Sequence, residues 1–467
     1  MGEDFRRREE QEVIKRFELA VKNKTYTFFD LEEFEEIISY YLQHQKYKKA
    51  LKACDVALNQ YPYSSELLIS KAQVLSNLEE FDDALVLLDT VSTLYPSDPE
   101  AIFLKATILS LCGRFEEAIQ EYERALPMME EKDEVYYNMG LAYQSFSKYT
   151  EAVECYKKAI EVNINHENAL YELAFCLDVT GELESSITYY EKFIDADPYS
   201  YHAWYNLGIV YNKLGQFEKA LQAYDYAILI DDSFASAYFN IGNTQMNMGN
   251  FQAALDAYQQ TIKCEGPSSE VYCCMGGAYE KMEQYEYAIK YYRKATKIDS
   301  LYDEPWYGLG SVFCKQEKHF EALHFLHKAI KLNSENMMYW YTLADAEFKV
   351  GNIISSLEAY QEANAIDPAY LPVWLDWSFA YHEQGDHARA TEIILQAIEE
   401  APEEAILYYR ATAYLIADGK YQEAFRYLEQ ALILNFDQHT VLLDFFPKVE
   451  TQKALFKIID QFRNNNI

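Results

Sequence analysis

Glycine and proline, the two residues that interrupt helices, are scarce in this chain. Its 467 residues include only 16 glycines and 11 prolines, roughly half of the usual combined share of about 12%. No Gly-, Pro- or Ser-rich linker divides the chain, although its length alone suggests several domains of about 150 residues each. Half of the residues are hydrophobic and 16% are aromatic, which argues against disorder. One continuous helical array is therefore expected.

Long apolar runs and paired cysteine motifs are also missing. No stretch of apolar residues reaches the length of a membrane-spanning helix. The N-terminal segment has neither the apolar centre of a signal peptide nor a myristoylation motif. The eight cysteines include no C-x-x-C pair, and Cys273 and Cys274 are too close for an ordinary bridge. These features predict reduced, buried thiols in a cytoplasmic protein that does not insert into membranes.

Basic residues are greatly outnumbered by acidic ones. The chain has 41 Lys and Arg against 75 Asp and Glu, a net charge of −34. Residues 1–30 are neutral, so the excess of acids lies further along the chain. A surface of this sign repels phosphate backbones, which argues against nucleic acid as a partner and favours a basic polypeptide. The alternative is that the acids only keep a long exposed array soluble.

Signatures of catalysis are weak or missing. No G-x-x-x-x-G-K-[ST] occurs, and the Gly-x-Gly at 308–310 lacks the third glycine of a dinucleotide site. His382 and His387 do not have the i, i+4 spacing of a zinc-binding helix. Three histidines share one predicted helix, where packing or solvation is the default and a metal site the alternative: His319, His324 and His327. We expect no enzyme, no cofactor and no metal.

What the chain has in abundance is a pattern with a period of 34 residues. The segments FEKALQAYDYA, FQAALDAYQQT and YEYAIKYYRKA begin at Phe217, Phe251 and Tyr285. Extending the period in both directions gives twelve units over residues 31–438 without an insertion or deletion. Within a unit numbered 1 to 34, apolar residues at positions 4, 8 and 11, and again at 20, 24 and 27, have helical spacing. Each unit is therefore predicted to be a pair of amphipathic helices.

Residue size follows the same period. Position 8 is usually small and position 20 is Ala or Ser throughout, so the two helices can approach closely, while large rings at positions 4 and 24 fill the space beside them. Proline stands at position 32 in five units, after the second helix. Glycine stands at position 15 in seven units and suits a left-handed cap after the first helix: Gly113, Gly181, Gly215, Gly249, Gly351, Gly385 and Gly419.

These marks, W-x2-L-G-x2-Y followed by A-x3-Y-x2-A and then P, resemble the tetratricopeptide repeat family. Residues 204–211, WYNLGIVY, match the first part letter for letter. The resemblance implies an all-α fold, a right-handed superhelical solenoid of about twelve 34-residue helix-turn-helix repeats over 31–438. Residues 1–30 are expected to form an N-terminal capping helix and 439–467 C-terminal capping helices. Departures at Ile38, Phe193 and Thr412 predict less regular packing in their units.

The resemblance further implies an inner groove lined by the first helices at positions 2, 5, 6, 9, 12 and 13. Aromatic rings there offer contact area at a small entropic cost, and Asn can donate to and accept from a peptide backbone. Some rings could instead only pack against the neighbouring hairpin. The predicted groove residues are Tyr137, Asn138, Tyr171, Tyr205, Asn206, Asn212, Phe239, Asn240, Asn243, Tyr307, Tyr341 and Asp345.

Lysines near the ends of four first helices form a second candidate set. They suit the helix dipole, and the alternative is that they contact an acidic group of a partner. The positions at which some family members clamp a C-terminal carboxylate are almost devoid of cations here, with Arg410 as the exception, so that type of binding is not expected. The four lysines are Lys213, Lys281, Lys315 and Lys349.

The sequence thus predicts a non-catalytic protein–protein interaction scaffold. It would bind a peptide or helix of a partner protein, and its charge favours a basic one, in the concave groove. The alternative is a regulatory or substrate-presenting subunit docked on an enzyme encoded by another chain. A self-associating structural protein is a third, weaker interpretation, and the sequence does not set the oligomeric state.

Overall fold

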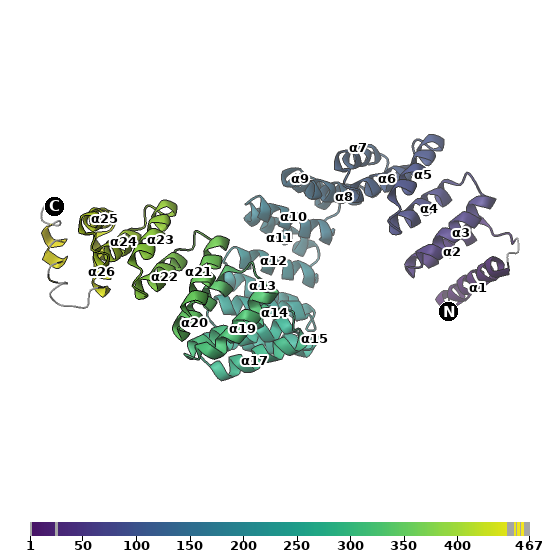
Figure 1. Ribbon diagram of the computed structural model, residues 1–467. Coiled ribbons are helices and arrows are strands. Elements are labelled where there is room, and N and C mark those ends of the chain that lie inside the picture. The colour runs from purple at the N-terminus through teal and green to yellow at the C-terminus, as the bar shows by residue number, and fades with distance from the viewer. Residues whose placement is uncertain (1, 24–26, 446–452, 454, 458, 462–467) are drawn as a thin grey trace. The chain divides into compact units, whose positions relative to one another are not determined.

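The computed structural model describes residues 2–23, 27–445, 453, 455–457 and 459–461. Within these residues the chain is helical and contains no strand. The all-α class and the pairing of helices predicted from the period are thus confirmed. The chain divides into two compact units, Met1–Asp232 and Ser233–Ile467, each a stack of consecutive helices (Figure 1).

In the first unit the helices follow one another with short connections, and η1 is a 3-10 turn. Its elements are α1 (Gly2–Asn23), α2 (Leu31–Gln43), α3 (Tyr47–Gln60), α4 (Ser65–Asn77), α5 (Phe81–Leu94), α6 (Pro99–Leu111), α7 (Phe115–Ala125), α8 (Lys132–Ser145), α9 (Tyr149–Val162), α10 (Glu167–Val179), η1 (Leu183–Ser185), α11 (Ser186–Ala196), α12 (Tyr201–Lys213) and α13 (Phe217–Ile230).

The second unit continues the same alternation. Its elements are α14 (Ala235–Asn247), α15 (Phe251–Glu265), α16 (Ser269–Lys281), α17 (Tyr285–Ile298), α18 (Glu304–Lys315), α19 (His319–Leu332), α20 (Met337–Val350), α21 (Ile353–Ile366), α22 (Leu371–Glu383), α23 (His387–Glu400), α24 (Ala405–Ala417), α25 (Tyr421–Leu434), η2 (Phe436–His439) and α26 (Thr440–Asp444).

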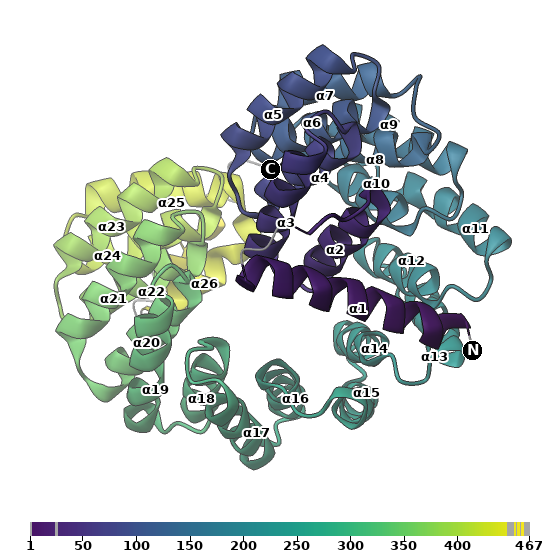
Figure 2. The same cartoon turned by 90° about the vertical axis from the view of Figure 1, so that its right-hand side faces the viewer.

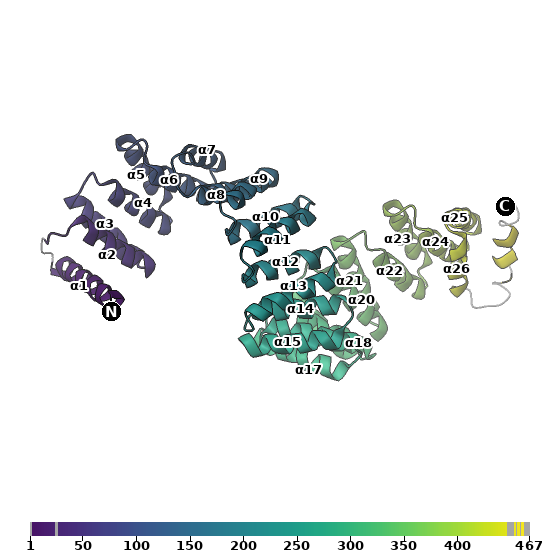
Figure 3. The same cartoon turned by 180° about the vertical axis from the view of Figure 1, so that it is seen from behind.

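Within each unit, first and second helices form two layers. From α2 to α25 the even-numbered helices are the first members of the pairs and the odd-numbered helices are the second members. Figure 2 shows α14, α16, α18 and α20 on the inner side of the curved second unit and α15, α17, α19 and α21 on its outer side. The same alternation is visible along α4 to α9 in the first unit (Figure 3). We call these two faces the inner and the outer surface.

The segments expected to cap the array are described in part. The helix α1 buries Ile14 and Phe17, and the Phe17 ring lies edge-on to Phe29 with 5.7 Å between ring centres. At the other end, Leu442 of α26 is buried in the core formed with α24 and α25. Much of the predicted cap in 439–467 lies outside the described residues. The division into caps and a twelve-unit array stays a prediction.

Side-chain caps begin several first helices. A reciprocal capping box opens α2, in which the Asp30 carboxylate accepts from the Glu33 amide at 2.8 Å and the Glu33 carboxylate accepts from the Asp30 amide at 3.1 Å. Ser200 and Ser268 accept in the same way from amides three residues on, which begins α12 and α16. These contacts satisfy amides that have no partner inside the helix.

Close approach between the two helices of a pair depends on the small residue at position 8. A Cβ added at Gly276 of α16 would lie 2.6 Å from the Tyr292 ring of α17, and one added at Gly242 would lie 2.4 Å from the Tyr258 ring. Tyr292 also lies against Gly308 of the next first helix, where an added Cβ would approach it to 2.4 Å. The Gly-x-Gly at 308–310 is thus a packing feature in this fold.

Tryptophans at position 4 fix the connection between successive pairs. Each indole N–H donates to the carbonyl six residues earlier, at the end of the preceding connection. The bonds join Trp204 to Pro198 (3.1 Å), Trp306 to Ser300 (3.2 Å), Trp340 to Ser334 (2.9 Å) and Trp374 to Pro368 (2.8 Å). A single side chain therefore packs between helices and also satisfies a loop carbonyl.

All seven predicted glycine caps have positive φ, between 71° for Gly215 and 92° for Gly351. The same position has positive φ in the five units that lack glycine there: Gln45, Glu79, Ser147, Glu283 and Glu317. The turn between the two helices is therefore set by the hairpin geometry and not by glycine alone. A left-handed conformation costs a non-glycine residue about 1–2 kcal/mol.

Replacing Glu283 with glycine is expected to stabilise the second unit by about 0.5–1 kcal/mol, because φ is 59° at this residue and glycine removes that strain. The thermal midpoint, followed by circular dichroism, should rise. The control is Gln284→Gly, where φ is −87° and glycine should give no gain. Equal effects of the two substitutions would contradict the strain argument.

Two adjacent glycines of α16 test the packing constraint. Gly276→Ala should destabilise the second unit by about 1–3 kcal/mol, since the Tyr292 ring must move to admit the methyl group. Gly277→Ala should instead stabilise it by up to about 1 kcal/mol, because an added Cβ there comes no closer than 3.7 Å to the Tyr292 hydroxyl. Urea and thermal denaturation of both variants measure the difference. If both substitutions changed the free energy of unfolding in the same direction, the close approach of the Tyr292 ring to Gly276 would not be what requires glycine there.

Candidate functional site

The predicted groove residues all lie on first helices, which form the inner surface. They are Tyr137 and Asn138 on α8, Tyr171 on α10, Tyr205, Asn206, Asn212 and Lys213 on α12, Phe239, Asn240 and Asn243 on α14, Lys281 on α16, Tyr307 and Lys315 on α18, and Tyr341, Asp345 and Lys349 on α20. Residues from α8 to α12 belong to the first unit and those from α14 to α20 to the second.

Several position-5 rings contact the buried tyrosine at position 24 of their own pair. In each pair the ring centres lie 5.8–6.2 Å apart, and the two ring planes are tilted relative to each other. The pairs are Tyr137 and Tyr156 (6.0 Å), Tyr205 and Tyr224 (5.9 Å), Phe239 and Tyr258 (5.8 Å), and Tyr341 and Tyr360 (6.2 Å). Part of the surface of each position-5 ring is therefore in contact with the neighbouring helix of its own pair. Tyr307 stacks on Tyr339 with centres 4.7 Å apart.

Some predicted polar groups also have internal partners. The Asn138 amide donates to the Glu134 carbonyl at 2.8 Å, and the Asn243 side-chain oxygen accepts from the Tyr258 hydroxyl at 2.8 Å. The Tyr341 hydroxyl donates to Asp376 at 2.6 Å. These side chains are held in fixed orientations, which preorganises the inner surface.

Two of the four predicted lysines form ion pairs with acidic residues of the preceding 34-residue repeat. Lys213 pairs with Asp178, and the Lys315 ammonium lies 2.9 Å from the Glu280 carboxylate. The other two predicted lysines are exposed and form no ion pair with a described residue. Burial raises the pKa of Asp345, and the neighbouring Lys349 opposes that shift.

Three predicted residues, Tyr171, Asn206 and Lys213, come together between α10 and α12. Two adjoining cavities lie there, which we call the inner cavities. The first, of about 200 Å³, is lined by Tyr171, Tyr190, Asn206 and polar groups that include Glu167 and His202. The second, of about 160 Å³, shares Tyr171, Tyr190 and Asn206, adds Phe175, Leu183, Ile209 and Val210, and ends at Lys213.

Exposed aromatic side chains mark the entrance of the inner cavities. Tyr171 is 53% exposed and Phe175 is 42% exposed, so both rings offer apolar surface beside the cavities. One cavity is mainly apolar and the other offers carboxamide, imidazole and carboxylate groups. The pair can take an apolar side chain beside a group that forms hydrogen bonds.

Tyr190 supplies a buried polar group to both inner cavities. Its side chain is only 1% exposed, and its hydroxyl forms no hydrogen bond with a described residue. Four of the six other tyrosines at position 24 do form one, for example Tyr156 to Gln144 at 2.7 Å and Tyr292 to Glu280 at 2.7 Å, whereas Tyr224 and Tyr360 form none with a described residue. Burial raises the pKa of Tyr190, so the hydroxyl keeps its proton. It is a donor that lines the two cavities, where an acceptor of a ligand could reach it.

The irregular pair around the inner cavities is the one where Phe193 replaces the usual alanine. The Phe193 side chain is buried, and α11 is preceded by the 3-10 turn η1. This agrees with the less regular packing predicted there. Ile38 and Thr412, the other departures, are buried within the regular helices α2 and α24. Sequence reasoning did not single out Phe175, Tyr190 or His202; the only signal near them was Phe193.

The histidines considered as metal ligands do not gather into a site. Among the described residues, no group of three or more His, Cys, Asp or Glu side chains is arranged to hold a metal ion. His327 faces Glu347 at 3.5 Å, and the His382 and His387 rings meet through their Nδ1 atoms at 3.0 Å. Burial, with His387 and Arg410 nearby, lowers the pKa of His382 to about 4.

None of the described helices combines the length and the apolar character needed to cross a membrane. The eight cysteines form no disulfide. Most are at least partly buried, and burial raises the pKa of Cys54 to about 12 and that of Cys155 to about 11.

Thiol reactivity should therefore differ sharply along the chain. At pH 8, well below the pKa of Cys54 and Cys155, their thiolate fractions are very small, so a thiol reagent should modify the exposed Cys264 first. Raising the pH should increase the rate of modification at Cys54 and Cys155 by a larger factor than the rate at Cys264. Mass spectrometry after timed alkylation measures this order, and equal rates at Cys264 and Cys54 would contradict it.

The repeated helix pairs, the left-handed turns and the inner surface define a helical-hairpin repeat protein. Models described as "Tetratricopeptide repeat" match residues 41–108, 134–166, 167–200, 201–234, 235–265 and 269–300, and one described as "TPR repeat" matches 106–145. These matches together cover more than half of the chain. The chain belongs to the tetratricopeptide repeat family.

Solved structures similar to this chain are also repeat proteins. One is from the Cut9–Hcn1 hetero-tetramer of APC/C (14% identity, 87% of this chain and 99% of that chain, TM-score 0.41). Another is a tetratricopeptide repeat protein from Parabacteroides merdae (12% identity, 53% and 98%, TM-score 0.44). A third is YrrB, described as a TPR protein with an unusual peptide-binding site (20% identity, 39% and 95%, TM-score 0.33). Among curated proteins, none matches this chain in sequence.

Proposed function

We propose that this chain is a non-catalytic protein–protein interaction scaffold that holds an extended segment of a partner protein at the inner cavities. The observation that carries the proposal is the pair of inner cavities, which Tyr190 lines with a hydroxyl that bonds to no described residue. Family membership supports the general role, because arrays of this kind present rigid helical surfaces to other proteins.

The lining of the inner cavities favours an extended peptide. Neighbouring side chains on one face of an extended segment lie about 7 Å apart, so one can enter the apolar cavity beside Phe175 while another enters the polar one. Asn206 borders both cavities and can donate to and accept from the peptide backbone between them. Tyr171 contributes an exposed ring at their common wall.

Tyr190→Phe tests this site with the smallest change. Removing the hydroxyl should weaken partner binding about three- to tenfold, the effect of one hydrogen bond, while the thermal midpoint stays constant because no internal bond is lost. Tyr171→Ala with Phe175→Ala should abolish capture of the partner. Affinity capture from a native lysate, followed by mass spectrometry at two salt concentrations, identifies the partner, and titration with it gives the affinities.

Tyr199→Ala is the control, because Tyr199 is 80% exposed and lines neither inner cavity. It should capture the same proteins as the unmodified chain. Tyr258→Phe is the control for stability, since it breaks the bond to Asn243 and should lower the thermal midpoint. Unchanged capture by the Tyr171 and Phe175 double variant would place the binding surface elsewhere.

A second candidate function is a regulatory or substrate-presenting subunit docked on an enzyme of another chain. Exposed apolar side chains on second helices favour it: Phe320 in the first turn of α19 is 74% exposed, and Ile354, at the same position of the next 34-residue repeat on α21, is 76% exposed. Phe320→Ser with Ile354→Ser should then remove the captured enzyme while leaving inner-surface binding intact. Retention of the enzyme by that variant would exclude docking through these residues.

A further inference from the structure

A further cavity lies on the outer surface of the first unit, between the second helices α11 and α13, with α12 as its floor. Its volume is about 310 Å³, and we call it the outer cavity. Glu191 and Asp195 line it from α11, Trp204 and Leu207 from α12, and Lys219 and Tyr226 from α13. It shares none of the residues that line the inner cavities.

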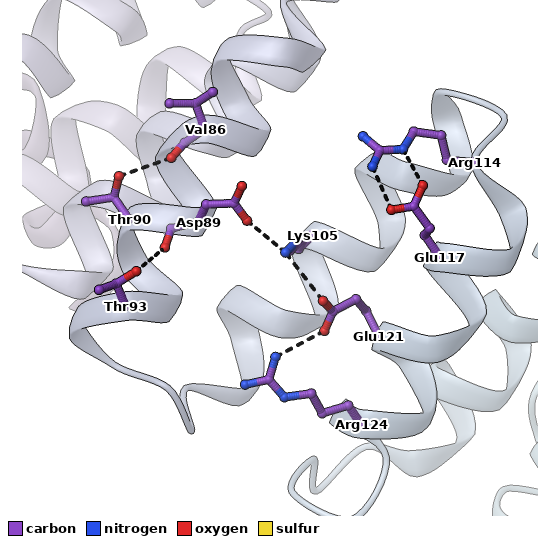
Figure 4. A network of polar contacts seen from close by, with 9 residues as sticks. All are labelled: Val86, Asp89, Thr90, Thr93, Lys105, Arg114, Glu117, Glu121 and Arg124. Atoms are coloured by element: carbon purple, nitrogen blue, oxygen red, sulfur yellow. Dashed lines mark hydrogen bonds and ion pairs between the residues drawn. The ribbon is translucent and has the colours of Figure 1, made fainter.

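The same place between earlier pairs is occupied by a lysine of the chain itself. The Lys71 ammonium lies 2.7 Å from the Asp55 carboxylate. One 34-residue repeat later, the Lys105 ammonium lies 2.8 Å from Asp89 and 3.4 Å from Glu121 (Figure 4). Both lysines stand at position 7 of a first helix, and Asp55 and Asp89 stand at position 25 of the second helix before it. In these two places a lysine at position 7 thus lies beside the position-25 carboxylate.

The outer cavity keeps the carboxylate and lacks the lysine. Glu191 is at position 25, but position 7 of α12 is Leu207, a buried apolar residue. Neither Glu191 nor Asp195 forms an ion pair or a hydrogen bond with a described residue. Lys219 lies instead over the Tyr211 ring, with its ammonium 5.2 Å from the ring centre. Two carboxylates therefore face an open space that an ammonium fills elsewhere in this unit.

Aromatic rings complete the wall of the outer cavity. The Trp204 indole stacks on Tyr226 with ring centres 4.5 Å apart, and Tyr226 is 51% exposed. Of the three equivalent tryptophans in the second unit, Trp306 has an internal cation, because the Lys328 ammonium lies 5.8 Å from its ring centre, whereas Trp340 and Trp374 have none among the described residues. At Trp204 the residue equivalent to Lys328 is Tyr226. A cation from outside would find both an aromatic wall and carboxylates there.

We propose that the outer cavity binds the ammonium or guanidinium group of a lysine or arginine side chain in an exposed basic segment of a partner protein. The apolar stem of such a side chain would pack on Trp204 and Tyr226, while its charge would pair with Glu191 and Asp195. The net charge of −34 draws basic segments toward the chain at long range.

Binding of end-capped pentapeptides to the full chain tests the proposal. The probes are Gly-Ser-Arg-Ser-Gly, its lysine counterpart, and its counterpart with neutral citrulline, each labelled and followed by fluorescence anisotropy at moderate salt. The arginine or lysine peptide should bind about fivefold or more tightly than the citrulline peptide. Glu191→Gln with Asp195→Asn should remove that difference.

Neutralising two exposed acids elsewhere in the first unit provides the matched control. Asp83→Asn with Glu116→Gln changes the total charge equally and should retain most of the preference for the charged peptides. Equal losses in the two double variants would overturn the proposal, because the attraction would then be a general effect of acidity. The inner-surface variant Tyr190→Phe should leave these peptide affinities unchanged.

Leu207→Lys fills the outer cavity from within. The new lysine would stand in register with Lys71 and Lys105 and pair with Glu191, so it should block the charged peptides while both carboxylates remain. Leu207→Met is the control for the change in packing and should bind as the unmodified chain does. A Leu207→Lys variant that melts normally and binds with unchanged affinity would overturn the proposal; if it fails to fold, the neutral double variant decides.

Discussion

The contact between a second-helix ring and the backbone of its first helix is the constraint on which the other features of this chain depend. At Gly140, Gly208, Gly242 and Gly276 an added Cβ would lie 2.4–2.6 Å from the facing tyrosine. Because the ring fills the space that a side chain would otherwise occupy, the helices of a pair come together at a fixed separation. The turn between the helices is equally constant, since all twelve residues at position 15 adopt positive φ whether or not they are glycine.

Placing a tyrosine in the core leaves its hydroxyl to be satisfied, and the first helix decides how. Gln144, Asn243 and Glu280 accept from Tyr156, Tyr258 and Tyr292, so in these pairs the polar edge of the ring is closed within the array. The hydroxyls of Tyr190, Tyr224 and Tyr360 bond to no described residue, and that of Tyr190 lines the inner cavities. The same packing requirement thus leaves a donor without an internal acceptor, and at Tyr190 that donor lies where we propose that a partner binds.

The sequence was sufficient for the helical pairs because each rests on a pattern of size and polarity that recurs with one period. Tyr171 and Asn206 could also be assigned to the inner surface, since position within the unit decides the face. Tyr190 could not, because position 24 is core in every unit, and the absence of an acceptor depends on two other helices. The positive φ at Glu283 and Glu317 could likewise not be predicted, since glutamate does not favour that conformation.

One helix connects the two proposed sites. On α12, Asn206 faces the inner cavities while Trp204 and Leu207 face the outer cavity, as neighbours on a helix must point in different directions. The Trp204 indole is fixed by its bond to the Pro198 carbonyl, and α12 begins at the Ser200 cap. Two ligands on opposite sides of α12 would therefore be held at a separation set by a single rigid helix. A scaffold that positions partners needs such a fixed separation more than it needs tight binding at either site, because the second ligand then meets its site at high effective concentration.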